Sequence, residues 1–110
     1  MLYKFKSKAT GDLIMLEANG RQILRIIGKD HTESLAKGIL LPEHMAQAIA
    51  ALEAAIAADE AAQKQRAQEA LERGEAAERP EGISLRQRAA PFIDTLRRCL
   101  KEQHELVWGV

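Results

Sequence analysis

The sequence predicts an α+β domain in which three helices pack against a minimal sheet formed by the N- and C-terminal strands. Three observations predict this fold. Apolar and basic residues alternate from Leu2 to Lys8, which is typical of a half-buried strand. Two later segments carry apolar residues at helical spacing, and the chain closes with the short apolar segment 106–110. Because an isolated strand has little stability, we expect the two terminal strands to pair.

Composition is that of one globular domain rich in helix. The chain has 110 residues, of which 46% are hydrophobic, 29% charged and only 4% aromatic, and alanine is abundant. The 16 basic and 16 acidic residues balance, which argues against a dedicated nucleic-acid-binding domain.

The sequence shows no signal peptide and no apolar run of the ~20 residues that span a bilayer. Cys99 is the only cysteine. We therefore expect a cytoplasmic protein without membrane association.

The N-terminal strand is followed by weaker signals. Residues 9–12 have the composition of a turn. Residues 13–16 are continuously apolar, so periodicity leaves strand, helix and loop open, and we interpret them as extended. Residues 29–37 are polar and unpatterned, and we expect a loop there.

Two interpretations compete for residues 20–27. Asn19 followed by Gln22 is a capping signal, and Gly28 is a natural helix stop. Asn19 and Gly20 are also a favoured hairpin turn. The flanking apolar residues are paired rather than alternating, so we predict a short helix and keep one half of a hairpin as the alternative.

A long helix is predicted from Pro42, a residue suited to a first helical turn, to about Arg73. Its apolar stripe ends well before the helix does. The residues of this stripe are Met45, Ile49, Leu52 and Ile56. Beyond them we expect a charged, mobile segment at about 60–82, containing Pro80.

The last helix begins with a capping box, in which Ser84 is followed by Gln87. Pro91 lies inside this helix and predicts a kink. The apolar face of the helix consists of Leu85, Ala89, Phe92, Ile93, Leu96 and Leu100. The predicted core of the whole domain consists of Phe5, Ile23, Leu24, Ile27, Ile49, Leu52, Ile56, Phe92, Ile93, Leu96 and Trp108.

We assign no catalytic, metal-binding or cofactor-binding residue. The three histidines, at positions 31, 44 and 104, lie in different segments without the spacing of a metal site. Gly28 and Lys29 are followed by Asp30, which would repel the phosphate of a nucleotide loop. An enzyme would have to use Cys99, Asp12 or Asp94. A nucleophile also needs a base, and none is recognisable, so we interpret Cys99 as structural.

Three classes of function remain. The leading hypothesis is a protein-interaction module that either self-associates or binds another protein, because no catalytic site is recognisable and the apolar stripe of the long helix ends before the helix does. The alanines of this helix let another helix approach closely, and that helix is either the last helix of the same chain or a helix of a partner. The second is a nucleic-acid accessory protein, and the third is a small enzyme. In the nucleic-acid hypothesis, phosphate groups would be bound by a surface of basic residues, which are Lys4, Lys6, Lys8, Arg86, Arg88, Arg97, Arg98 and Lys101. We prefer to interpret the lysines as protection of an edge strand, and the aromatic residues as core.

Several segments together resemble one known family. They are residues 5–9 (FKSKA), 20–29 (GRQILRIIGK), 38–42 (GILLP), 48–56 (AIAALEAAI), 84–89 (SLRQRA) and 107–110 (VWGV). In these segments the chain resembles the domain-of-unknown-function 1840 family, over nearly its whole length except about 60–80. The resemblance implies one intact domain in the bacterial cytosol. It implies no activity, cofactor or binding residue.

Overall fold

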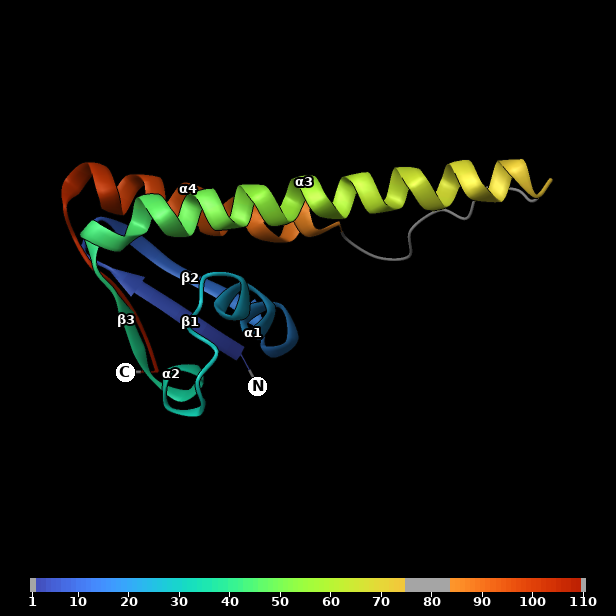
Figure 1. Ribbon diagram of the computed structural model, residues 1–110. Helices are drawn as coiled ribbons and strands as arrows, with labels where there is room; N and C mark the ends of the chain where they lie inside the picture. The colour runs from blue at the N-terminus through green and yellow to red at the C-terminus, as the bar shows by residue number, and fades with distance from the viewer. Residues whose placement is uncertain (1, 75–83, 110) are drawn as a thin grey trace.

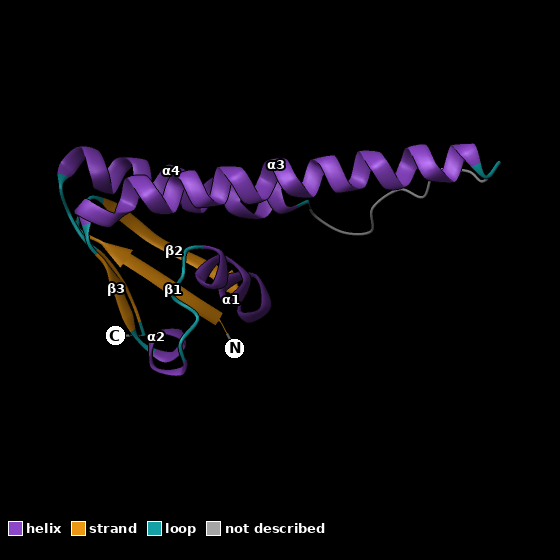
Figure 2. Cartoon of the chain, in the orientation of Figure 1, coloured by secondary structure: helices purple, strands orange, loops and turns teal. Residues whose placement is uncertain are grey.

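The computed structural model describes residues 2–74 and 84–109 and combines a four-stranded sheet with helices (Figure 1, Figure 2). This confirms the predicted α+β class. The elements in chain order are β1 (Leu2–Ser7), β2 (Thr10–Leu16), α1 (Glu17–Ile26), α2 (Thr32–Ala36), β3 (Gly38–Leu40), α3 (Pro42–Glu72), α4 (Leu85–Glu102) and β4 (Leu106–Trp108). Within the described ranges, none of the helices combines the length and the apolar composition needed to span a bilayer.

The sheet is antiparallel, with strand order β2-β1-β4-β3. The terminal strands pair as predicted, with Phe5 opposite Trp108. Two further strands extend this minimal pair. Residues 13–16 lie in β2, which confirms the extended interpretation, although β2 already begins at Thr10, inside the predicted turn. β3 has three residues, too few for an alternating pattern to be visible in the sequence.

One face of the sheet, the covered face, packs against helices. Phe5 is fully buried there, with ring centroids 5.0 Å from Phe92 and 5.8 Å from Trp108. Trp108 lies directly over Gly38, where a Cβ atom would come within 2.3 Å of the indole. α1 and α4 contact β2, and α3 contacts α1 and α4. The hydrophobic core therefore lies between this face and the helices.

The predicted helix at 20–27 is confirmed as α1, but it begins earlier. Its N-cap is Leu16, which makes no side-chain cap, and Asn19 lies inside the first turn. An ion pair of 2.8 Å between Glu17 and Arg21 supports this turn instead. Gly28, at φ +81°, follows the helix end.

The predicted loop at 29–37 is wrong in part, because residues 32–36 form the short helix α2. The reason is tertiary. The Tyr3 hydroxyl donates a hydrogen bond of 2.7 Å to the Leu35 carbonyl oxygen, and Leu35 packs against the core. These contacts hold a single turn that has too few residues to show a helical period.

α3 and α4 lie side by side and run in opposite directions, and α3 continues well beyond the start of α4 (Figure 1). α3 begins at Pro42 as predicted. The capping box of α4 is present: Gln87 N–H donates to Ser84 Oγ, and Ser84 N–H donates to Gln87 Oε1, both at 3.2 Å. α4 continues through Pro91 to Glu102. Residues 60–72 of the expected charged segment belong to α3, and its positions 75–82 lie outside the described residues.

The predicted core is buried except at Ile27 and Ile49, which are partly buried against the same cluster. Ile27 is the C-cap residue that follows α1, and Ile49 lies on α3 next to the buried Ala48. Residues of the buried core cluster that the prediction omitted are Met15, Leu40, Met45, Ala48, Leu85, Ala89, Cys99 and Leu106.

Candidate functional site

The three residues that an enzyme would need lie in different environments. Cys99 is fully buried in α4, whereas Asp12 and Asp94 are exposed. Asp94 pairs with Arg98 at 3.3 Å on the outer side of α4. Among the described residues, no hydrogen bond or ion pair joins Cys99 or Asp12 to another side chain. The structure therefore does not assemble a nucleophile and a base from these candidates.

The three histidines also lie apart from one another in the fold. His31 and His44 are exposed at the beginnings of α2 and α3, and His104 follows the end of α4. In residues 2–74 and 84–109 no three histidine, cysteine or carboxylate side chains come close enough to hold a metal ion.

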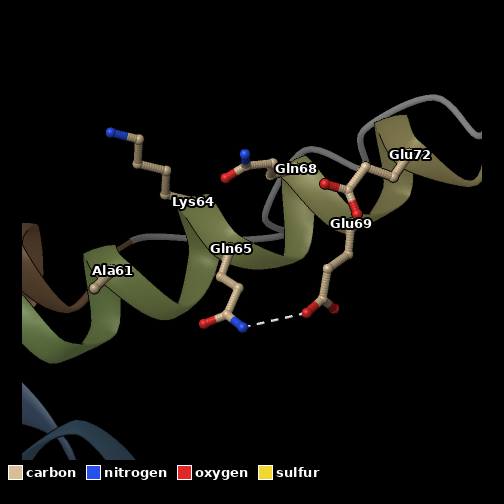
Figure 3. Close-up of a pocket in the computed structure, with 6 residues that line it drawn as sticks. All are labelled: Ala61, Lys64, Gln65, Gln68, Glu69 and Glu72. Carbon is tan, nitrogen blue, oxygen red and sulfur yellow. Dashed lines mark hydrogen bonds between the residues drawn. The ribbon is translucent and has the colours of Figure 1, made fainter.

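A hollow lies along the distal part of α3 (Figure 3). Its lining residues all come from this one helix and are Ala61, Lys64, Gln65, Gln68, Glu69 and Glu72. The side chains point outward from successive turns, and Gln65 Nε2 donates to Glu69 Oε1 at 3.2 Å. Side chains on one helix surface do not converge on a substrate as residues from several elements do, so we assign no active site here.

The basic residues do not form one surface. Lys4 and Lys6 lie on the side of the sheet opposite α4, which carries Arg86, Arg88, Arg97, Arg98 and Lys101. Most α4 arginines form ion pairs with carboxylates. Arg97 pairs with Glu53 at 2.7 Å, and Arg86 pairs with Glu60, which lowers the pKa of Glu60 through a hydrogen bond to its carboxylate.

Arg88 is the exception on α4. It is partly buried, and its Nη1 donates to Asn19 Oδ1 at 3.5 Å. Its Nε atom is buried and has no partner among the described residues.

The interpretation of Lys4 and Lys6 as edge protection is wrong, because β1 is an interior strand and the edges of the sheet are β2 and β3. The strand order depends on tertiary pairing, which the local pattern does not encode. The two lysines instead lie near the middle of the uncovered side of the sheet. Their charge is therefore a property of that surface.

We term this side of the sheet, which no helix or strand in residues 2–74 and 84–109 covers, the open face. Its side chains alternate with those of the covered face and are Leu2, Lys4, Lys6, Asp12, Ile14, Leu16, Ile39 and Val107. Leu2, Ile14 and Leu16 are 61%, 54% and 63% exposed, and Ile39 is 45% exposed. Leu2 lies opposite Leu16, and Val107 lies opposite both Lys6 and Ile39. Sequence reasoning missed this surface, since apolar residues in a strand are ordinarily assigned to the core.

The apolar stripe of α3 packs within the same chain, which is one of the two alternatives that the sequence left open. Met45, Leu52 and Ile56 are buried in the core formed with α1, α4 and the sheet. Beyond them α3 is mostly exposed, as at Leu71. The open face therefore replaces this stripe as the candidate binding surface.

Comparison with known proteins identifies the family. The model of a domain of unknown function (DUF1840) matches residues 1–108 of the 110 residues, and this agrees with the resemblance seen in the sequence. No curated protein and no solved structure matches the chain. The chain belongs to the domain-of-unknown-function 1840 family.

Proposed function

We propose that this protein is a non-catalytic interaction module that binds a partner protein through the open face of its sheet. The observation that carries the proposal is the exposure of Leu2, Ile14, Leu16 and Ile39 on one side of a sheet whose other side is fully packed. An apolar patch of this kind on a folded domain commonly marks an interaction site. The same proposal assigns the interaction to the cytoplasm, supported by the buried free thiol of Cys99.

The energy available from this face suits reversible binding. Burying a fully exposed leucine or isoleucine stabilises by about 1.5–3 kcal/mol, so side chains that are already half covered contribute roughly half of this. Together, the apolar side chains of the face supply on the order of 5 kcal/mol. Association costs about 4–15 kcal/mol in lost freedom, so a partner must add polar contacts to bind stably.

The test compares two substitutions of the same kind. Leu16 on the open face and Leu71 on α3 are leucines of nearly equal exposure, 63% and 66%. Leu16→Asp introduces a charge into the open face, while Asp at this N-cap position is compatible with α1. Leu71→Asp introduces the same charge elsewhere. Tagged wild-type protein and both variants are used for capture from nuclease-treated extract, with mass spectrometry as the readout and thermal melts to confirm folding.

We expect wild type and Leu71→Asp to retain a common protein partner that Leu16→Asp loses. Equal capture by all three proteins would contradict the proposal. A partner lost on nuclease treatment would instead support the nucleic-acid hypothesis. Light scattering at high concentration tests self-association, and a dimer abolished by Leu16→Asp would make the partner a second copy.

A further inference from the structure

The open face has two apolar ends with positive charge between them. At one corner Leu2 and Leu16 lie opposite each other, next to Ile14. At the other end Val107 and Ile39 lie opposite each other on β4 and β3. Lys4 lies opposite Ile14, and Lys6 lies opposite Val107, so the β1 lysines separate the two ends.

Lys4 is the residue that sets the chemistry of a partner. It is exposed, and among the described residues no hydrogen bond or ion pair reaches it. A partner that contacts both apolar ends must pass over the Lys4 ammonium group and remove water from it. Removing water from an unpaired charge is costly, whereas a carboxylate placed against it restores the lost interaction.

We propose that the open face binds an acidic amphipathic helix of a partner protein, with a carboxylate against Lys4 and apolar side chains at both ends. This inference rests on the proposed function and specifies the partner. A helix is the expected element because a second helical layer would complete a three-layer arrangement around a sheet that has helices on one side only.

The strand geometry gives the spacing of the apolar anchors. Adjacent strands lie about 4.8 Å apart and residues rise about 3.3 Å along a strand, which puts the two apolar ends roughly 14–20 Å apart. A helix rises 1.5 Å per residue, so its anchors are about 9–13 residues apart, with the acidic residue between them.

A second copy of this chain fits the face less well. Two open faces related by a twofold axis through their centres would bring Lys4 of one face near Lys4 of the other, and like charges that lose water repel strongly. The carboxylate on the face, Asp12, lies towards the Ser7 end of the paired strands, away from Leu2 and Leu16.

The test uses two labelled, helix-favouring peptides with leucines at about three turns' separation. One peptide has Glu between the leucines, and the other has Lys at the same positions. Fluorescence anisotropy measures the affinity of each for the full-length wild type, Lys4→Glu, Lys4→Arg and Leu16→Asp. Lys4 is exposed in a strand, so these substitutions leave the core intact.

We expect wild type and Lys4→Arg to prefer the Glu peptide by about tenfold, and Lys4→Glu to reverse the preference, as expected for a close charge pair. Leu16→Asp should weaken both peptides. Absence of binding, equal affinities, or a preference unchanged by Lys4→Glu would overturn the inference. Binding to phosphatidylserine vesicles that the Glu peptide does not displace would also overturn it. None of these results decides the proposed function, because the Leu16→Asp capture experiment tests that function separately.

Discussion

The two faces of the sheet are built from the same strands but have opposite surroundings. On β1, Phe5 is fully buried among aromatic rings, while Leu2 is largely exposed. On β2, Met15 is buried, while its neighbours Ile14 and Leu16 are exposed. Both faces carry large apolar side chains, and the open face also carries Lys4, Lys6 and Asp12, so the apolar side chains of the two faces differ mainly in whether helices cover them. We infer that the covered face stabilises the fold and the open face is available for binding. Stability and binding should therefore depend on different residues.

The largest loss in the free energy of unfolding is expected from a substitution at the centre of the covered face. Phe5→Ala removes a fully buried ring that contacts Phe92 and Trp108, and it should reduce the free energy of unfolding by about 3–5 kcal/mol. Leu2→Ala, on the open face of the same strand, should change it by less than about 0.5 kcal/mol. Urea denaturation of both variants measures the two values. Similar losses for both would show that the two faces do not differ in this way.

A second pair extends the comparison to α3. Leu52 is fully buried, so Leu52→Ala should cost about 2–5 kcal/mol, and Leu96→Ala in α4 should cost as much. Leu71→Ala on the exposed distal part of α3 should fall within about 0.5 kcal/mol of wild type. Denaturant melts provide the measurement. A small loss at Leu52 would mean that the helix layer contributes little to the core.

Replacing either of two glycines in the sheet, Gly38 or Gly11, by alanine should change the stability by a smaller amount, and the two changes should differ in direction. Gly38→Ala places a Cβ atom 2.3 Å from Trp108 Cζ2, so the indole must move, at a cost of about 1–3 kcal/mol. Gly11 in β2 has no atom within 4 Å of such a Cβ, so Gly11→Ala should be neutral or stabilising by up to about 1 kcal/mol. The melting temperature should fall in Gly38→Ala and should stay the same or rise in Gly11→Ala. Trp108 fluorescence should change in Gly38→Ala and not in Gly11→Ala.

Features set by neighbours in sequence could be predicted. The alternation of Tyr3 and Phe5 with Lys4 and Lys6 identified a strand and its buried side. Pro42 marked the beginning of α3, and Ser84 with Gln87 marked that of α4. Each signal depends on local backbone chemistry, which the sequence records directly.

Features set by tertiary pairing could not be predicted. Residues 13–16 are all apolar, so the pattern that separates the two faces of β2 is absent, and exposed Ile14 resembles buried Met15 in the sequence. The strand order put Lys4 in the interior of the sheet, although lysine is typical of edges. For the same reason the open face was not predicted: exposure depends on where the helices pack.

The smallest change in stability is expected away from both faces of the sheet, at the exposed ion pair between Glu60 in α3 and Arg86 in α4. The hydrogen bond from Arg86 lowers the pKa of Glu60, so the folded protein binds this proton less readily than the unfolded chain. The pair therefore stabilises the fold above the unfolded-state pKa, and this stabilisation is lost as pH falls through the lower folded-state pKa. Glu60→Gln should be slightly less stable than wild type near about pH 7, and the difference should be smaller near about pH 3. Denaturation at both pH values, with exposed Glu72→Gln as control, measures it. A difference that grows on acidification would contradict the assigned direction. Because the pair is exposed, water and salt screen it, and even this inter-helix contact should matter far less than Leu52 in the covered core.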